Sequence, residues 1–196
     1  QPNRPSPSTS MGLGILPYAT ARWLASKMSP SAALRCAERL SDGQYHCSAS
    51  DRAGVRANLS AITGHSVAEW SPDVRSVFRN FGGYLTEFLL ADQWGQAAFR
   101  IEGAQELQAA IHAHRGAIVL SAHLGNWELG GLALGWRGVP VSVVALSHRD
   151  PAVDRLFVGQ RQRAGVDVIP LNARAMRRCA ARLRSGGAVC LLGDRE

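Results

Sequence analysis

Short apolar segments alternate with helical segments from about residue 98 to residue 196, and this alternation is the strongest constraint on the fold. The apolar segments predict strands, and the sequences between them carry helix start and stop signals. Strands that alternate with helices form βαβ units, so we predict an α/β fold with a mainly parallel sheet and helices on both faces. The expected strands span 98–103, 117–122, 141–146, 166–170 and 188–194, and the helices between them span 104–116, 126–138, 150–165 and 172–186.

The part of the chain before this sheet predicts helices only. Three domain ranges follow: 1–10 as a disordered leader or scar, 11–95 as a helical segment, and 96–196 as the α/β core. In the helical segment, helices are expected over 29–43, 50–64 and 66–94, the first ending at Gly43 and the last with Pro72 at a first helical position. The apolar stretch 11–28 is too short to span a bilayer, so an interfacial helix and an N-terminal core helix both remain open.

The net charge suggests several classes of binding partner, and the cysteine spacing bears on metal binding. Lys and Arg outnumber Asp and Glu by 22 to 15, a formal charge of +7, and Lys27 is the single lysine. Arginine suits phosphate groups of nucleic acid, anionic lipid or a phosphorylated cofactor, but GC-rich coding also favours arginine. The four cysteines have no CxxC spacing, so free thiols and no metal site are expected.

The stretch "SAHLGNWELGG" at 121–131 carries the candidate chemistry. His123 follows an apolar strand, Asn126 is a good N-cap, and Glu128 falls in the first turn of the next helix. Ligands of parallel α/β sheets gather beyond the carboxyl ends of the strands, so we expect Glu128 to face His123 and hold its imidazole as a general base. No GxSxG nucleophile is present, which favours a hydroxyl supplied by the substrate. A strand-end histidine beside a helix cap is the structural alternative.

The same stretch resembles the active-site segment of the lysophospholipid acyltransferase superfamily, whose hallmark is HxxxxD or HxxxxE. The form "HLGNWE" is similar to one branch, the lipid A late acyltransferases and phosphatidylinositol mannoside acyltransferases. The likeness extends over roughly 98–196, through "RQRAGVDVIP" and "GDRE". Members of that branch continue beyond this last segment, so the α/β core is expected to be incomplete at its C-terminus.

The resemblance implies an enzyme that moves a fatty acyl chain from an acyl thioester to a hydroxyl of a membrane glycolipid. The donor would be acyl coenzyme A or an acyl carrier protein, with no further cofactor. The implied location is the cytoplasmic face of the bacterial cell membrane, peripheral or N-terminally anchored, against an anionic surface and without nucleic acid. A non-catalytic membrane-surface or phosphate-binding α/β module is the alternative.

Seven residues are assigned roles by this resemblance. His123 is the expected base and Glu128 its partner. Arg161, and then Arg163, are expected to bind the donor phosphate or an oxyanion, and solvated arginines at a helix end are the alternative. The further substrate-binding candidates are Asn126, Asp194 and Glu196.

One helix carries a row of arginines. Arg174, Arg178 and Arg182 recur every four residues within 172–186, beside an apolar stripe. Such a row is typical of a solvated helix face, and it also suits an acidic carrier protein or anionic headgroups.

Overall fold

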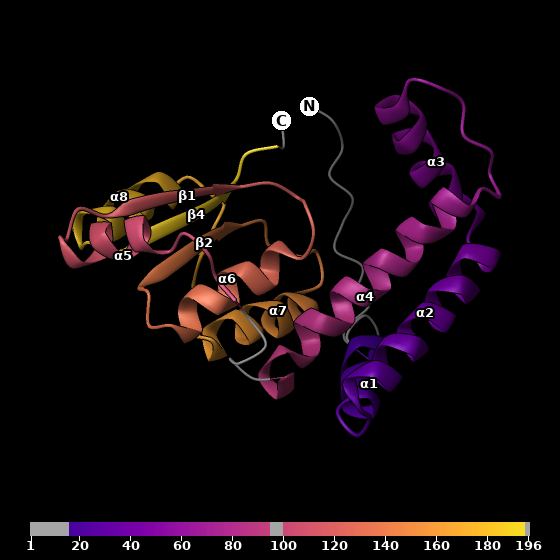
Figure 1. Ribbon diagram of the computed structural model, residues 1–196, viewed down its shortest axis with the longest axis horizontal. Coiled ribbons are helices and arrows are strands. Elements are labelled where there is room, and N and C mark those ends of the chain that lie inside the picture. Colours follow the sequence, from indigo (N-terminus) through magenta and orange to yellow (C-terminus); the bar gives the residue numbers. More distant parts are fainter. Residues whose placement is uncertain (1–15, 95–99, 195–196) are drawn as a thin grey trace.

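The computed structural model describes residues 16–94 and 100–194 (Figure 1). Four helices come first: α1 (Leu16–Ala25), α2 (Pro30–Cys47), α3 (Ala49–Thr63) and α4 (Pro72–Trp94). The remainder alternates helices with strands: α5 (Gln105–His112), β1 (Ala117–Ser121), α6 (Trp127–Trp136), β2 (Val141–Ala145), α7 (Pro151–Arg163), β3 (Asp167–Pro170), α8 (Ala175–Arg184) and β4 (Ala188–Leu192).

The four strands form one parallel sheet in the order β1-β4-β2-β3, which confirms the predicted α/β fold. Their carboxyl ends are level, because Ser121 pairs with Leu192 and Ala145 pairs with Pro170. The strand expected over 98–103 is wrong where it can be examined, since 100–103 have no strand structure, and its first two residues lie outside the described ranges.

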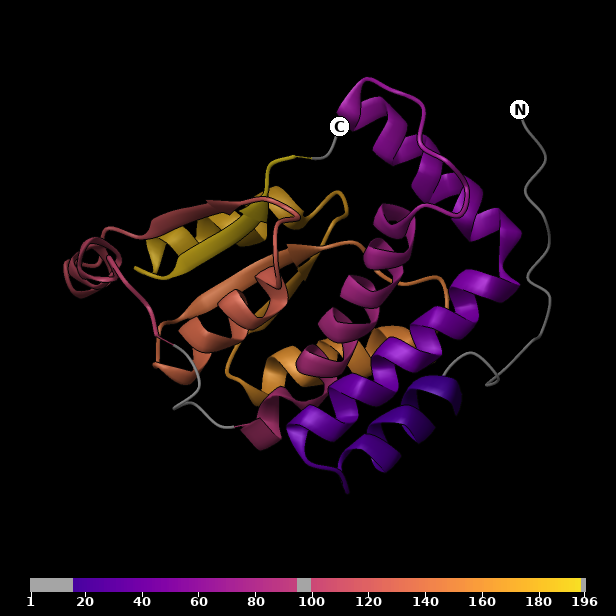
Figure 2. The same cartoon turned by 45° about the vertical axis from the view of Figure 1, so that its right-hand side comes forward.

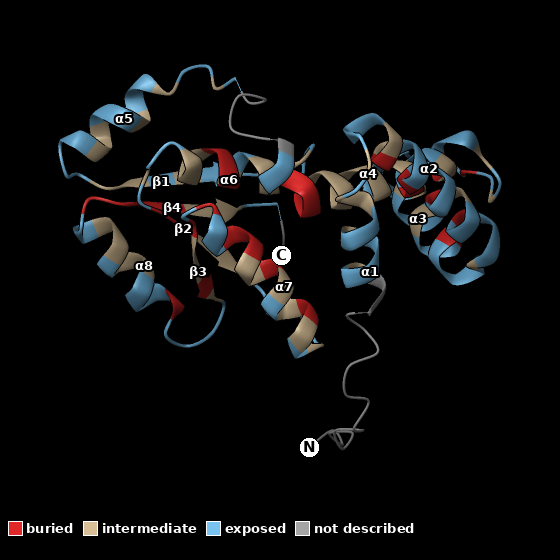
Figure 3. Ribbon diagram, turned by 90° about the horizontal axis from the view of Figure 1, so that it is seen from below, coloured by how far each residue is buried: buried red, intermediate tan, exposed pale blue. Residues whose placement is uncertain are grey.

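Helices cover both faces of the sheet, as Figure 3 shows with α5 and α6 on one side and α8 on the other. On the first side, Leu132 of α6, Phe157 of α7 and Val141 of β2 belong to one buried cluster. Successive side chains of a strand point to opposite faces, so Ser142 faces α8. Helix α8 therefore closes the second face over β4, β2 and β3.

The helices α1 to α4 gather on one side of the molecule (Figure 2). Pro72 begins α4 and Gly64 ends α3 with a left-handed backbone, both as predicted. Gly43 does not end α2: the helix runs to Cys47 and so places Tyr45 in a buried cluster with Val67, Val74 and Phe78. Among the described residues, no helix combines the length and apolar character needed to cross a membrane.

Helix α4 connects the two parts of the molecule. Its first half packs in the cluster around Phe78, whereas Phe88, Leu89 and Ala91 from its second half lie in the core that α6, α7 and the sheet share. Phe88 and Ala91 are fully buried there. The expected division at 95/96 thus falls just after a helix that contributes to both cores, and the three domain ranges stay a prediction.

Candidate functional site

The turn that carries His123 joins the end of β1 to α6. Gly125 has a φ of 60°, a left-handed conformation that glycine adopts without steric cost. Asn126 then caps α6, because its side-chain oxygen accepts the backbone N–H of Leu129 at 3.3 Å. Its amide donates to the carbonyl of Tyr84 and to Glu87, both on α4. Asn126 therefore fixes the turn against α4, and its substrate-binding role stays a prediction.

His123 is bonded twice to Asp194, which follows the end of the neighbouring strand β4. The backbone N–H of His123 donates to one carboxylate oxygen at 2.7 Å, and its ring Nδ1 lies 2.9 Å from the other. The backbone N–H and then the ring of His123 lower the pKa of Asp194 below its usual value. The ionised carboxylate only accepts hydrogen bonds, so Nδ1 carries a proton. In the neutral form of a ring held in this way, Nε2 is the nitrogen with the free lone pair.

Glu128 does not make the contact with His123 that the spacing predicted. Its two oxygens accept Nε of Arg161 at 2.9 Å and Nη2 of Arg161 at 2.5 Å. The side chains are 11% and 9% exposed, so this is a buried, bidentate ion pair between α6 and α7. The imidazole partner comes instead from β4, because strand order brings Asp194 beside His123 across 71 residues of chain.

The catalytic roles of His123 and Glu128, and the donor-side role of Arg161, stay predictions.

A row of aromatic rings runs from α4 to His123. The rings of His123 and Trp127 lie edge to face, with centroids 4.6 Å apart. Trp127 stacks on Tyr84 at 4.9 Å, and Tyr84 stacks on Phe81 at 5.9 Å. Burial and then the charge of Glu128 raise the pKa of Tyr84, which keeps its hydroxyl neutral. The sequence analysis missed this row, although Phe81 and Tyr84 stand three residues apart on one helix face.

Arg163 lies away from this turn, in a polar cluster around Asp92 of α4. Its Nε donates to Asp92 at 3.0 Å, and Gln160 and Arg22 donate to the same carboxylate. The cluster joins α1, α4 and α7, which favours a packing role for Arg163. Glu196 lies outside the described residues.

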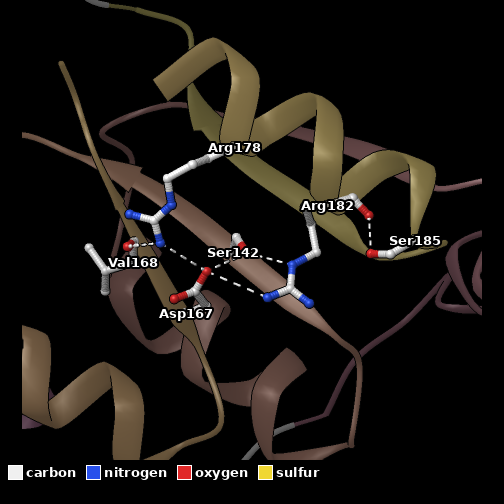
Figure 4. A network of polar contacts seen from close by, with 6 residues as sticks. All are labelled: Ser142, Asp167, Val168, Arg178, Arg182 and Ser185. Carbon is white, nitrogen blue, oxygen red and sulfur yellow. Dashed lines mark hydrogen bonds and ion pairs between the residues drawn. The ribbon is translucent and has the colours of Figure 1, made fainter. Parts of the chain in front are cut away.

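The arginine row of α8 divides into two groups. Figure 4 shows Arg178 and Arg182 pointing from α8 toward Asp167 and Ser142 on the sheet. Arg182 donates to Ser142 at 2.8 Å, and both arginines lie 3.5 Å from one oxygen of Asp167. A cavity of about 270 Å³ lies beside this network. These two arginines thus hold α8 to the sheet, whereas no side-chain bond of Arg174 is found within 16–94 and 100–194.

The arrangement at the end of β1 suits proton transfer. A histidine oriented by a carboxylate and about one third exposed can take a proton from a bound hydroxyl through Nε2. No cluster of three potential metal ligands occurs in the part of the chain that the structure describes.

Comparisons with known proteins agree on one class of enzyme, the acyltransferases. Residues 10–196 match the family described as bacterial lipid A biosynthesis acyltransferase. A phosphatidylinositol mannoside acyltransferase of Mycolicibacterium smegmatis is 27% identical over 72% of this chain and 49% of its own length. One of Mycobacterium tuberculosis is 26% identical over 90% of this chain and 58% of its own length.

Proposed function

Because the chain belongs to the bacterial lipid A biosynthesis acyltransferase family, we propose that its parent protein transfers a fatty acyl chain to a hydroxyl of a membrane glycolipid. The family and the two mycobacterial relatives support acyl transfer to a glycolipid, of the lipid A or the phosphatidylinositol mannoside type. The chain spans 49–58% of the length of these relatives, so the activity is proposed for the whole protein.

In the proposed reaction, His123 acts as the general base. Nε2 takes the proton of the acceptor hydroxyl while the hydroxyl oxygen attacks the carbonyl carbon of the acyl thioester. The tetrahedral intermediate then collapses, the carbon–sulfur bond breaks, and the imidazolium returns the proton to the leaving thiolate. Asp194 stabilises the imidazolium between these two steps and keeps Nδ1 protonated throughout.

Glu128 has a supporting role in this mechanism. Its buried bond to Arg161 fixes the first turn of α6 against α7, and the ring of Trp127 in the same turn lies against His123. The pair therefore sets where the base stands, and the oxyanion or donor phosphate remains a proposed second contact of Arg161.

The donor and the location are further parts of the proposal. An acyl carrier protein and acyl coenzyme A both present a thioester on a phosphopantetheine arm, which suits an arginine-rich chain. A membrane glycolipid acceptor requires that the protein works at the membrane surface. We place it on the cytoplasmic face, as a peripheral or N-terminally anchored protein.

The hydrogen bond between His123 and Asp194 carries this proposal, and substitution of the base tests it. His123→Ala in the whole protein should lower acyl transfer about 10²- to 10⁴-fold, because the hydroxyl loses its proton acceptor. Radiolabelled acyl thioester and extracted membrane glycolipid give the rate, and circular dichroism checks the fold. His65→Ala, at an exposed histidine of the helical part, is the matched control. A folded His123→Ala protein with wild-type turnover would refute the mechanism.

A further inference from the structure

Exposed leucines gather at the edge of the sheet where His123 lies. Three described loops leave the carboxyl ends of the strands: 122–126, 146–150 and 171–174. Each of them exposes one leucine, and Met176 follows in the first turn of α8. The exposed fractions are 83% for Leu124, 54% for Leu146, 59% for Leu171 and 80% for Met176.

The opposite edge of the sheet differs in this respect. The segments that lead into the amino ends of the strands are 113–116, 137–140, 164–166 and 185–187, all within the described residues. None of these four turns exposes a large apolar side chain. Ile118 and Leu120 are also exposed, on strand β1 itself. Single exposed apolar residues are common on protein surfaces, but among the described turns of the sheet they occur at the carboxyl edge, which marks this edge as a contact surface.

Basic side chains stand among these leucines. Arg149, Arg174 and Arg177 are exposed in the same loops and the first turn of α8. No hydrogen bond or ion pair of their guanidinium groups is found among the described residues. Arg178 and Arg182, one and two turns farther along α8, are bound to the sheet. The free arginines thus lie next to the exposed apolar side chains.

We propose that this carboxyl edge is the surface that lies on an anionic membrane. This inference rests on the proposed function, because a glycolipid acceptor is held in a membrane and His123 stands at the same edge. Leucine and methionine side chains would enter the boundary between headgroups and acyl chains, and the arginines would contact lipid phosphates. The contact residues are Leu146, Leu171 and Met176 with Arg174 and Arg177.

Vesicle binding tests the surface without any acyl transfer. The probe is a vesicle of phosphatidylglycerol and phosphatidylcholine, and the readout is cosedimentation at low salt. The double variant Leu146→Gln/Leu171→Gln should bind about tenfold more weakly, since it loses two inserted apolar side chains. The matched control is Leu40→Gln/Ile62→Gln, which changes two leucine-sized side chains that are 72% and 82% exposed on α2 and α3.

A second pair tests the charge. Arg174→Gln/Arg177→Gln should weaken binding several-fold more than Arg39→Gln/Arg56→Gln, which removes the same net charge from exposed positions of α2 and α3. Equal losses in both arginine pairs would mean attraction by total charge and would overturn the proposed surface.

Three further outcomes would overturn the proposed surface. They are wild-type binding by the leucine double variant, an equal loss of binding in its control, and no vesicle binding by the wild-type protein. If the edge variants weaken vesicle binding as expected but the whole protein shows no acyl transfer, the surface is supported and the proposed function is rejected.

Discussion

At the scale of single residues, the structure places Asp194, which the sequence suggested as a substrate-binding residue, in the contact with His123 that the HxxxxE spacing predicted for Glu128. Asp194 contacts His123, and Glu128 contacts Arg161. The first contact acts on the protonation of a ring that is about one third exposed, and the second fixes two helices through a buried ion pair. Substitutions at the two positions should therefore change different measured quantities.

Asp194→Asn should lower the transfer rate about 10- to 10³-fold, because an amide no longer enforces the Nδ1–H tautomer or stabilises the imidazolium. The pH–rate profile should shift as well, since the lowered pKa of Asp194 keeps its carboxylate ionised throughout the neutral range in the wild type. Steady-state kinetics across pH give both quantities. Asp154→Asn is the control, because Asp154 accepts the backbone N–H of His148 and contacts that ring in the same manner. A wild-type pH profile for Asp194→Asn would contradict the assignment.

Glu128→Gln should lower the free energy of unfolding by about 3–5 kcal/mol, because it leaves the guanidinium of Arg161 buried beside a neutral amide. Chemical denaturation measures this change. The double variant Glu128→Gln/Arg161→Gln should lose less than the sum of the two single variants, since the uncompensated charge is then absent. Additive losses would show that the two side chains stabilise the fold independently.

At the scale of helices and strands, local signals in the sequence predicted several helix ends. Pro72, Gly64 and the Asp150–Pro151 pair act within one turn of their own helix, so their effect can be read from neighbouring residues. Gly43 failed as a helix stop because the burial of Tyr45, 4% exposed, favours another turn of α2. That burial depends on packing against α4, which the local sequence does not contain.

The sequence identified the residues of the candidate site, but it predicted only part of the contacts between them. His123 and Asp194 were both named from the sequence, each at the end of an apolar segment. Their contact depends on β4 lying between β1 and β2, and strand order is a tertiary property. Glu128, five residues from His123, was chosen as its partner because spacing along the chain was the only distance the sequence supplied.

The packing of α6 on α7 leads to a prediction about one glycine. A Cβ at Gly135 would lie 2.2 Å from the carbonyl oxygen of Ala164, which no side-chain rotation relieves. Gly135→Ala should therefore lower the free energy of unfolding by about 1–3 kcal/mol. Gly130→Ala, in the same helix with open space around its Cβ, should instead raise it by up to about 1 kcal/mol. Equal thermal denaturation midpoints for the two variants would contradict this close approach.

At the scale of the whole molecule, the helical part and the α/β part share α4. Phe78 and Phe88 are ten residues apart on this helix, and they belong to different buried clusters. The first cluster joins α4 to the α2 and α3 end, and the second joins α4 to α6, α7 and the sheet. Phe78→Ala and Phe88→Ala should each lower the free energy of unfolding by about 3–5 kcal/mol, because each removes a ring from a well-packed core. The two variants thus disturb the two clusters to a similar extent.

Hydrogen exchange should show how far each loss spreads. Phe88→Ala opens the core that α4 shares with α6, α7 and the sheet, so amide protection should fall in β4, α6 and α7 together. Phe78→Ala should lower protection in α2 and α3 and leave the β4 amides as in the wild type, because their core remains filled. Mass spectrometry of exchanged peptides from the two proteins measures this difference. An equal fall in β4 protection for Phe78→Ala would mean that the described chain opens as one cooperative unit, with α4 transmitting the loss from one cluster to the other.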